Sequence, residues 1–556
     1  MSHQRQIYHA LAEAFAAEGV DTQFGLMGDG NMLWMTAMSH LPGMTTFGVR
    51  HEHCACMMAI GYWSATGKVG VASVTHGPGF TQTMTALTTA ARNFVPLVVF
   101  AGEAPLTAPW YLQAMDHAAL AKACGAEYIP LHSTARMYHD VREAFYIAQF
   151  DRKPVVIGVP ADLQELVAPD LGTYRPSAEL LPQPQRITPD PGQIAELASL
   201  LSEAKAPVIV AGRGVMQSDA RSEVEALAEK TGAMLGTSLL AKGMFDHNPN
   251  SLGIVGGYAR QASRDVGKSV DLVVVFGASL SRFTTDSGKM FPNAKMVQVD
   301  ILPTGYREGL KPAHVYIKAD AKLAATALLA AVASKQAKAD IRSLALSKRL
   351  REEPADDTRY IISDGTLDPR RVFEELERVI PTDYDFVSGS AHQAYWHTTM
   401  RGADPRNYHA VRAFGAIGNA FAFASGIAVA RKNGRVVLFE GDGGLLMQIQ
   451  ELESLKRQGV KLLIVCCNDG AFGAEVHKLR KDGIDDSGAV FGRPPFEAIA
   501  KGFGVRGATI SDIAQFAGLM KDYEAHADVE IWDVHVSDQV LAPNMRDAVG
   551  YKPPTT

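Results

Sequence analysis

Two glycine turns late in the chain carry side-chain oxygens at a spacing that suits a metal ion. The turn at residues 441–444 (GDGG) follows an apolar, strand-like run, and Asn468 stands at the end of the next such run. If the two runs are neighbouring parallel strands, as right-handed crossovers favour, both turns lie at one edge of one sheet. Asp442 and Asn468 would then hold one cation, with the backbone carbonyl near Gly470 as a third oxygen.

Magnesium suits such a site, because it prefers hard oxygen ligands and is usually completed by water and substrate phosphates. So few protein ligands imply a bound diphosphate, and the helix N-terminus beyond Gly443 would face that anion. A lone GDG is most often only a turn. The chain contains its own control, since residues 28–30 are also GDG, yet Ala55 stands 26 positions after Asp29 and no strand ending in Asn follows.

The local pattern places these turns in an α/β layer. Apolar runs predict strands at 435–440 and 462–467, and helical spacing predicts a helix at 447–458 that Gly459 ends. The same alternation starts at the N-terminus with a helix at 4–18, and a later helix is expected at 53–65. Further strands are expected at 22–27, 46–49, 69–74, 95–100, 154–160, 207–211, 272–276, 295–299 and 385–388.

Composition excludes several classes of function. The 556 residues are 47% hydrophobic and 21% charged, as in soluble globular proteins, and are enough for three domains. A net charge of −6 without a basic block predicts no nucleic-acid or membrane partner. No signal peptide or membrane-spanning stretch is evident, so a cytoplasmic location is expected. The five cysteines lack zinc spacing and are expected to be buried and free of disulfides.

The stretch from Arg50 to Pro105, which includes RHEHCACMMAIGYWSATGK and THGPG, resembles the pyrimidine domain of acetolactate-synthase-like, thiamine-diphosphate-dependent enzymes. The GDG followed by Asn468 resembles their cofactor motif. The resemblance extends over nearly the whole chain and implies three doubly wound parallel-sheet (Rossmann-like) α/β domains. Their order would be pyrimidine-binding (1–180), central (192–335) and diphosphate-binding (365–556).

Composition marks the linkers between these domains. The proline-rich segment 181–191 (LPQPQRITPDP) indicates a boundary, and the charged, alanine-rich segment 333–364 is expected to be a helical linker. Phrases of the central domain, such as LVVVFGASLSRF, resemble the same family. Some members bind FAD or an ADP moiety there, to which Gly212-Arg213-Gly214 would contribute, whereas many relatives keep the fold with an empty site, so this cofactor stays an open alternative.

The resemblance also implies which residues bind thiamine diphosphate and Mg²⁺. Glu52 matches the glutamate that activates the cofactor, and the turn at 389–393 matches VGQHQ, although Ser390 and Ala391 depart from the usual Gly and Gln. Ile417 would hold the cofactor in a bent shape. The metal ligands would be Asp442, Asn468 and Gly470. The full set of cofactor-binding residues is Glu52, Thr75, Ser390, His392, Gln393, Gly415, Ile417, Gly441, Asp442, Gly443, Gly444, Asn468, Gly470, Ala471 and Phe472.

Polar residues near the reacting carbon would decide the outcome of the reaction. His76 stands where many synthases have Ser, and Gln113 and His117 lie in a stretch that resembles a loop with a catalytic or substrate-binding Gln. Glu475 and His477 lie near the position of a catalytic Glu in simple 2-oxo-acid decarboxylases, one residue further from Asn468 than expected. Glu52, His76, Gln113, His117 and Glu475 are therefore the candidate catalytic residues, with a structural role as the alternative.

The main expectation is a thiamine-diphosphate- and Mg²⁺-dependent lyase that decarboxylates a 2-oxo acid through an enamine and is capable of carboligation. The alternative is an acetolactate-synthase-type transferase that condenses two carbonyl compounds. An FAD-dependent oxidase, a lyase of pre-formed C–C bonds and a non-catalytic paralogue are further alternatives. Substrates would be small 2-oxo acids or aldehydes. Because Glu52 and Asp442 come from different subunits in relatives, a homodimer or homotetramer with sites at the interface is expected.

Overall fold

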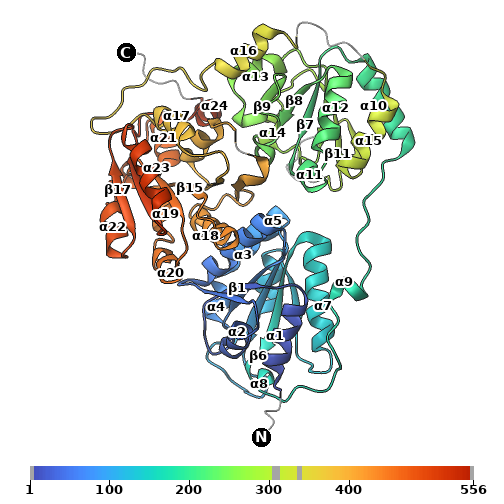
Figure 1. Ribbon diagram of the computed structural model, residues 1–556, viewed down its shortest axis with the longest axis vertical. Helices are drawn as coiled ribbons and strands as arrows, with labels where there is room; N and C mark the ends of the chain where they lie inside the picture. The colour runs from blue at the N-terminus through green and yellow to red at the C-terminus, as the bar shows by residue number, and fades with distance from the viewer. Residues whose placement is uncertain (1–4, 304–312, 335–340, 403, 551–556) are drawn as a thin grey trace.

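The computed structural model describes residues 5–303, 313–334, 341–402 and 404–550, and it contains three α/β layers in succession along the chain (Figure 1). Each layer has a six-stranded sheet, and all strand pairings between described residues are parallel. The expected fold class is therefore confirmed. The exact domain boundaries stay a prediction.

The N-terminal sheet has the strand order β2-β1-β3-β4-β6-β5. Its strands are β1 (Thr22–Gly25), β2 (Thr45–Gly48), β3 (Gly70–Val74), β4 (Leu97–Glu103), β5 (Glu127–Pro130) and β6 (Pro154–Pro160). The helices around it are α1 (Ile7–Ala17), α2 (Met32–Ser39), α3 (Glu52–Thr66), α4 (Pro78–Thr81), α5 (Met84–Asn93), α6 (His117–Ala123), α7 (Met137–Ile147), α8 (Ala161–Gln164) and α9 (Ser177–Leu180). Because helices cover both faces, β3 and β6 are buried along their whole length and are continuous apolar runs.

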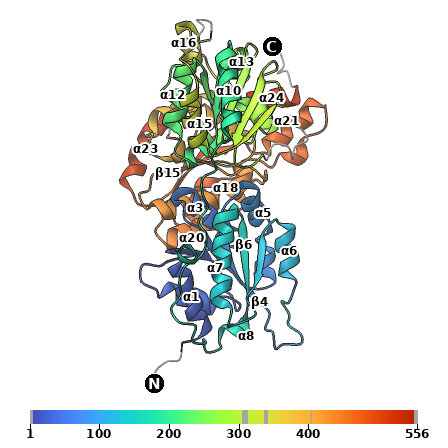
Figure 2. The same cartoon turned by 90° about the vertical axis from the view of Figure 1, so that its right-hand side faces the viewer.

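The central sheet has the order β12-β11-β10-β7-β8-β9. Its strands are β7 (Pro207–Ala211), β8 (Met234–Thr237), β9 (Ser251–Ile254), β10 (Leu272–Phe276), β11 (Lys295–Asp300) and β12 (Val315–Lys318). Its helices are α10 (Pro191–Glu203), α11 (Arg213–Gln217), α12 (Arg221–Thr231), α13 (Gln261–Gly267), α14 (Arg282–Thr285) and α15 (Ala321–Ala331). This layer lies beside the C-terminal layer and above the N-terminal one (Figures 1 and 2).

The expected helical linker at 333–364 is wrong for most of its described length. Only α16 (Leu344–Glu352) is helical there, and Leu350 packs into the core of the central layer. The helix starts where the Ser343 hydroxyl caps the Leu346 N–H. It ends just before Pro354, whose ring disfavours a helical conformation at the preceding residue. Residues 335–340 lie outside the described residues.

The C-terminal sheet, with the order β14-β13-β15-β16-β18-β17, repeats the strand order of the N-terminal sheet. Its strands are β13 (Asp385–Ser388), β14 (Tyr408–Ala410), β15 (Val436–Gly441), β16 (Leu463–Asn468), β17 (Arg506–Ile510) and β18 (Glu530–His535). Its helices are α17 (Pro369–Val379), α18 (Asn419–Arg431), α19 (Asp442–Leu446), α20 (Glu451–Arg457), α21 (Gly473–Lys481), α22 (Phe496–Gly502), α23 (Gln515–Ala525) and α24 (Pro543–Val549).

The helix expected at 447–458 is wrong in its bounds. A short helix, α19, begins at Asp442 itself, and α20 begins only at Glu451, with turns between them. The side chain of Gln448 is buried in this break, and its Oε1 accepts a hydrogen bond of 3.0 Å from the Ala422 N–H of α18. This hydrogen bond is a tertiary contact, so the spacing of apolar residues along the sequence could not predict it.

Helices α3 and α18 join the N-terminal and C-terminal layers (Figures 1 and 2). They approach so closely that a Cβ on Gly61 would lie 2.0 Å from the Phe423 carbonyl oxygen. A Cβ on Gly426 would lie 1.9 Å from the Met58 carbonyl oxygen. Because α3 begins at Glu52, this contact fixes the start of that helix against the C-terminal layer.

The expectation about the cysteines agrees with the described structure. All five cysteines are free and buried. Among the described residues, no helix has the length and apolar character needed to cross a bilayer.

Candidate active site

Asp442 and Asn468 emerge side by side at the carboxyl edge of the C-terminal sheet. Strands β15 and β16 are parallel neighbours, and Gly441 pairs with Cys467, so the next residue of each strand leaves the sheet at the same level. This is the arrangement expected from the strand–turn–helix–strand pattern. The crossover between the strands therefore brings the two polar side chains to one place.

The Asp442 carboxylate is 2% exposed and is held by backbone donors. Its Oδ1 accepts from the Gly443 N–H at 2.8 Å, and its Oδ2 accepts from the Gly470 N–H at 2.7 Å. Burial raises the pKa of Asp442 to about 6, although these N–H groups act in the opposite direction. A nearby cation would favour the ionised carboxylate.

The Asn468 side chain is fully buried, and its amide oxygen has no hydrogen-bond partner among the described residues. Its Nδ2 donates to the Asp533 carboxylate at 2.8 Å and to the Pro494 carbonyl at 3.0 Å. Buried polar atoms are nearly always partnered, so an orphaned amide oxygen beside a buried carboxylate indicates a missing ligand. A divalent cation would satisfy it.

Gly470 is held by hydrogen bonds through both its carbonyl oxygen and its N–H. Its carbonyl oxygen accepts the N–H groups of Phe491 and Gly492, both at 3.0 Å, so it is occupied by the turn that packs over it. Its N–H donates to the Asp442 carboxylate, and its expected role as the third metal ligand stays a prediction. Sequence spacing could not reveal the hydrogen bonds to the carbonyl, because their donors come from a turn about twenty residues further along the chain.

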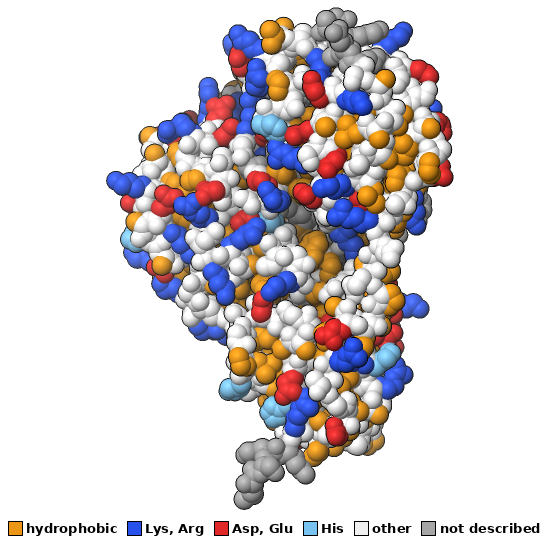
Figure 3. Space-filling view, turned by 45° about the vertical axis from the view of Figure 1, so that its right-hand side comes forward, with side chains coloured by type: hydrophobic (Ala, Val, Ile, Leu, Met, Phe, Trp, Pro, Cys, Tyr) orange, Lys and Arg blue, Asp and Glu red, His pale blue; other side chains and the backbone are white. Residues whose placement is uncertain are grey.

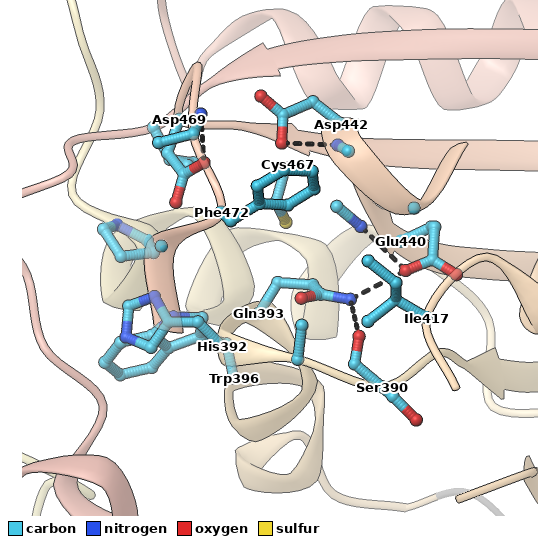
Figure 4. A pocket seen from close by; sticks show the side chains of 18 of the residues that line it. Ser390, His392, Gln393, Trp396, Ile417, Glu440, Asp442, Cys467, Asp469 and Phe472 are labelled. Atoms are coloured by element: carbon cyan, nitrogen blue, oxygen red, sulfur yellow. Dashed lines mark hydrogen bonds between the residues drawn. The ribbon is translucent and has the colours of Figure 1, made fainter. Parts of the chain in front are cut away.

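A small cavity of about 50 Å³ lies between Asp442 and the turn that follows β13 (Figure 4), and neither Asn468 nor Gly470 is among the described residues that line it. Eleven of the expected site residues line it: Ser390, His392, Gln393, Ile417, Gly441, Asp442, Gly443, Gly444, Ala471, Phe472 and Glu475. Such a volume holds a water molecule or two, not a diphosphate. The Phe472 ring lies in front of Cys467, between Asp442 and Gln393, and it is half-exposed, so it is the side chain best placed to move aside.

The turn after β13 points donors toward the cavity. The His392 Nε2 accepts the Ala542 N–H at 2.9 Å, so the proton of the neutral ring is on Nδ1. Burial lowers the pKa of His392 to about 3, which keeps the ring neutral. The Ser390 hydroxyl is buried without a partner among the described residues. An anion in the cavity would receive hydrogen bonds from both groups.

Glu440 is a buried acid in this site that sequence reasoning missed. Its Oε1 accepts from Gln393 Nε2 at 2.9 Å and from the Gly441 N–H at 3.0 Å, while its Oε2 has no partner among the described residues. Burial raises the pKa of Glu440 to about 8. Its position gave a signal, since an acid that ends an otherwise apolar strand directly before GDG has to be buried.

The other expected residues of this domain have varied positions. Ile417 lines the cavity, as a support for a cofactor ring should, whereas Gly415, in a left-handed turn with φ 75°, is not among the described residues that line it. The Glu475 carboxylate is exposed and accepts from Lys478 Nζ at 3.2 Å. His477 is buried 4.8 Å from the His392 ring, centroid to centroid.

The N-terminal candidates form a second group at the edge of their own sheet. Within the described residues, none of Glu52, Thr75, His76, Gln113 and His117 lines the cavity beside Asp442. Most of their contacts are with one another's turns, although residues beside Glu52 contact the C-terminal layer: the Arg50 N–H donates to Glu451 at 2.9 Å, and His53 Nε2 lies 2.9 Å from Asn419 Oδ1. Glu52 lies at the start of α3, where a Cβ on Gly79 would be 3.3 Å from its Oε1, and the Thr75 hydroxyl accepts the Gly30 N–H at 3.0 Å.

The two histidines of this group are neutral. His76 Nε2 and the Tyr111 hydroxyl are 3.0 Å apart, and burial lowers the pKa of His76. His117 Nε2 accepts the Gly77 N–H at 3.1 Å, and burial lowers its pKa to about 4. In both rings Nδ1 is buried without a partner among the described residues. The single chain therefore holds two separate halves of the expected site.

The residues fit a diphosphate with a divalent cation. Three buried polar atoms of the C-terminal site lack protein partners among the described residues: Asn468 Oδ1, Ser390 Oγ and Glu440 Oε2. An amide oxygen next to a carboxylate suits Mg²⁺, and a hydroxyl with a neutral imidazole N–H suits phosphate oxygens. The donor set therefore matches the group that the sequence implied.

The central layer does not require a nucleotide to explain its glycines. A Cβ on Gly212 would lie 2.2 Å from the Gly277 carbonyl oxygen, and one on Gly214 would lie 2.6 Å from the Gly277 Cα. The turn after β7 thus packs directly on the turn after β10, which accounts for glycine at these positions. Binding of FAD or ADP here stays a prediction.

Three domain families match the chain in succession. Residues 5–120 match "Thiamine pyrophosphate enzyme, N-terminal TPP binding domain", residues 194–328 match "Thiamine pyrophosphate enzyme, central domain", and residues 389–531 match "Thiamine pyrophosphate enzyme, C-terminal TPP binding domain". Thiamine pyrophosphate is another name for thiamine diphosphate. The matches contain both halves of the expected site.

Several relatives align along almost their entire length. The "Probable acetolactate synthase large subunit" of Methanococcus aeolicus is 27% identical over 92% of this chain and 89% of its own length. The "Acetolactate synthase large subunit" of Haemophilus influenzae is 26% identical over 90% and 89%, respectively. The "Acetolactate synthase isozyme 2 large subunit" of Escherichia coli is 27% identical over 92% and 91%.

These names correct the main functional expectation. A decarboxylating lyase was expected, but the relatives are named as acetolactate synthases, which fits the alternative of a transferase that joins two carbonyl compounds. The sequence motifs did not separate the two, because both reactions use the same cofactor site. Since the three domain families occur in their order and together cover more than two thirds of the chain, the protein belongs to the thiamine pyrophosphate enzymes.

Proposed function

We propose that the protein is a Mg²⁺- and thiamine-diphosphate-dependent carboligase of the acetolactate synthase type, which transfers the acyl group of a 2-oxo acid to a second carbonyl compound with loss of CO₂. The alignment with acetolactate synthases over about nine tenths of the chain carries the choice of reaction. The orphaned Asn468 oxygen beside Asp442 supports the choice of cofactor and metal.

The residues of the C-terminal layer would bind the cofactor. Asp442 and Asn468 would hold Mg²⁺, and the Ser390 hydroxyl and the His392 Nδ1–H would donate to diphosphate oxygens. Ile417 would pack against the cofactor rings. Thiamine diphosphate supplies the nucleophilic carbon and the electron sink for loss of CO₂ and formation of a C–C bond.

The N-terminal group would supply the proton transfers. Glu52 would hold a proton at the pyrimidine ring, as its match to the activating glutamate of the family implies. His76 and His117 each present a neutral ring whose buried Nδ1 has no partner among the described residues, so each could exchange a proton with a substrate oxygen. Glu475 stays a weaker candidate, because it is exposed and paired with Lys478.

A second copy of the chain would complete the site. Glu52 and its neighbours do not line the cavity beside Asp442 within the described residues, which supports a site that another subunit completes. Large apolar side chains are exposed at both edges, as expected for faces that a subunit interface covers. They are Met27, Trp110 and Leu112 in the N-terminal layer, and Met447, Phe472 and Phe491 in the C-terminal layer. A homodimer or a homotetramer satisfies this arrangement.

Co-expression of two inactive variants tests the shared site. In a hybrid of Glu52→Gln and Asp442→Ala subunits, one of the two sites combines an intact Glu52 with an intact Asp442. If sites are shared, random pairing should restore about a quarter of wild-type activity. Hybrids that stay inactive, although they assemble, would show that each site is built within one chain.

The reaction itself is tested by incubating the purified protein with thiamine diphosphate, Mg²⁺ and pyruvate, alone and with a second 2-oxo acid. Release of CO₂ together with an acetohydroxy acid is the expected result. Release of CO₂ with free acetaldehyde alone would contradict the proposal. A yellow protein that contains FAD would also settle the open question about the central layer.

A further inference from the structure

The carboxylate of Asp533 contacts the candidate metal-binding amide from the strand beside it. Asp533 lies on β18, next to β16 in the sheet, and its side chain is 1% exposed. Its Oδ1 accepts a hydrogen bond of 2.8 Å from Asn468 Nδ2. Its Oδ2 accepts one of 3.1 Å from the Phe496 N–H at the start of α22.

These contacts decide which end of the Asn468 amide faces the cation. The Nδ2 group has two hydrogens, and the acceptors around it are Asp533 Oδ1 and the Pro494 carbonyl. Each hydrogen of the amide nitrogen therefore has a protein acceptor. The Oδ1 atom is left buried and without a partner among the described residues, so the oxygen is the end that is free for a metal.

Among side chains of this size, only a carboxylate can accept both hydrogen bonds at position 533. Asn468 Nδ2 and the Phe496 N–H are both donors, so the side chain between them has to offer two acceptors. An asparagine offers one acceptor. If it served Phe496, its own amide N–H would face Asn468 and would favour a flipped Asn468 amide, which places a donor where the cation should bind.

We propose that Asp533 is a positioning residue of the metal site, which orients the Asn468 amide so that its oxygen faces the divalent cation. The inference rests on the proposed function, because that function places Mg²⁺ at Asp442 and Asn468. Groups that fix the orientation of a metal ligand typically change metal affinity 10- to 100-fold when they are replaced. Asp533 would act in this way without touching the cofactor.

The test is a titration of the full-length protein with Mn²⁺ in the presence of saturating thiamine diphosphate, with free Mn²⁺ followed by electron paramagnetic resonance. Asp533→Asn should weaken Mn²⁺ binding about 10- to 100-fold. Asp533→Glu keeps the charge but moves the two oxygens, so it should weaken binding as well. The Mg²⁺ concentration for half-maximal activity should rise by the same factor, with kcat at saturating Mg²⁺ changed much less.

Glu530→Gln is the matched control. Glu530 is a buried acid on the same strand, 2% exposed, and it binds Arg506 and Trp532 at 2.8 Å each, at the other end of β18. Its variant should bind Mn²⁺ like the wild type, even if its melting temperature falls. Equal affinities in wild type and Asp533→Asn would overturn the inference, and so would wild-type affinity in Asp533→Glu, since charge alone would then suffice.

The remaining outcomes separate the inference from the proposed function. If both Asp533 variants fail to fold while Glu530→Gln folds, Asp533 belongs to the anchoring of α22, and the inference is wrong. If the wild type binds Mn²⁺ with thiamine diphosphate and the variants do not, but no acetohydroxy acid forms, the reaction is wrong and the inference stands. A wild type that binds no Mn²⁺ overturns both.

Discussion

The chain contains the triplet GDG twice, in sheets of identical strand order, yet the two copies form different structures. In residues 28–30 the aspartate is exposed, the Gly28 N–H donates to Asn31 Oδ1 at 2.8 Å, and helix α2 begins only at Met32. In residues 441–443 the aspartate is 2% exposed and starts helix α19 itself. The same three residues thus make a surface turn in one place and a buried candidate metal site in the other.

The neighbouring strands explain the difference. The first triplet follows β1, which lies between β2 and β3, and these strands lead into turns that carry Glu52 and Thr75. The second follows β15, whose neighbour β16 ends in Asn468. The triplet supplies a turn, whereas the strand beside it supplies the second candidate ligand. A glycine motif is therefore informative only together with the end of its neighbouring strand.

The largest expected effect comes from Asp442→Ala. Loss of the carboxylate removes a ligand and leaves the Gly443 and Gly470 N–H groups without their acceptor. We expect Mg²⁺-dependent binding of thiamine diphosphate to fall by at least about 100-fold, since charge-assisted hydrogen bonds and a metal bond are lost together. Calorimetric titration of the cofactor measures this. Unchanged affinity would remove the second triplet from the cofactor site.

Glu52→Gln should separate binding from turnover. The side chain lies beside the first triplet's sheet edge and not in the cavity next to Asp442, so cofactor affinity should stay within a few-fold of wild type. Turnover should fall by about 10²- to 10⁴-fold, the usual contribution of a positioned proton-transfer group. The pair of measurements is calorimetry for binding and product formation from pyruvate for turnover. Full activity in this variant would contradict the role of Glu52.

Glu440→Gln tests a further difference between the two triplets. Glu440 precedes the second triplet and can ionise, whereas Met27, at the corresponding position before the first triplet, cannot. The effect of this substitution should therefore depend on pH. The pKa of Glu440 is raised to about 8 in the folded protein, from an ordinary value of 4.5. As pH rises between these values the unfolded chain ionises first, so the folded cofactor-free protein loses stability, by about 3 kcal/mol at pH 7. Glutamine cannot ionise and avoids this loss.

We therefore expect the melting temperature of Glu440→Gln, relative to wild type, to rise between pH 5 and pH 8. Both proteins are compared without cofactor, so that metal binding does not contribute. The neighbouring Asp442 carboxylate also raises the pKa of Glu440, so the difference includes the interaction between the two acids. A constant difference in melting temperature across this range would show that Glu440 keeps its ordinary acidity.

Asp29→Asn should have the smallest effect and serves as the control for Asp442. Its side chain is exposed, and the turn around it is held by Asn31 and Thr75 instead. Metal and cofactor affinities and the melting temperature should match those of wild type, since exposed substitutions usually change stability by less than about 0.5 kcal/mol. A loss of cofactor binding as large as that of Asp442→Ala would contradict the distinction between the two triplets.

Much of the C-terminal site could be predicted because its parts are close to regular strands. The parallel crossover between β15 and β16 leaves little freedom in where Asp442 and Asn468 leave the sheet, so their placement at one edge follows from the order of elements. Glu440 was missed because a strand pattern shows that it is buried but not which cavity it faces. The helix break at 447–450 was missed because it depends on a hydrogen bond between Gln448 and α18, which is a tertiary contact.

The sequence by itself determined the α/β alternation and the positions of Asp442 and Asn468 at strand ends, because hydrophobic periodicity and turn chemistry are local. Its resemblance to a known family implied the three layers and the role of Glu52. The tertiary structure decided how these residues are used. In the folded chain the Gly470 carbonyl accepts hydrogen bonds from the turn at 491–492, and Asp533 accepts one from the Asn468 amide. Glu52 is not among the described residues that line the cavity beside Asp442. Such outcomes depend on which donors and acceptors meet across distant segments, and only packing of the whole chain settles that.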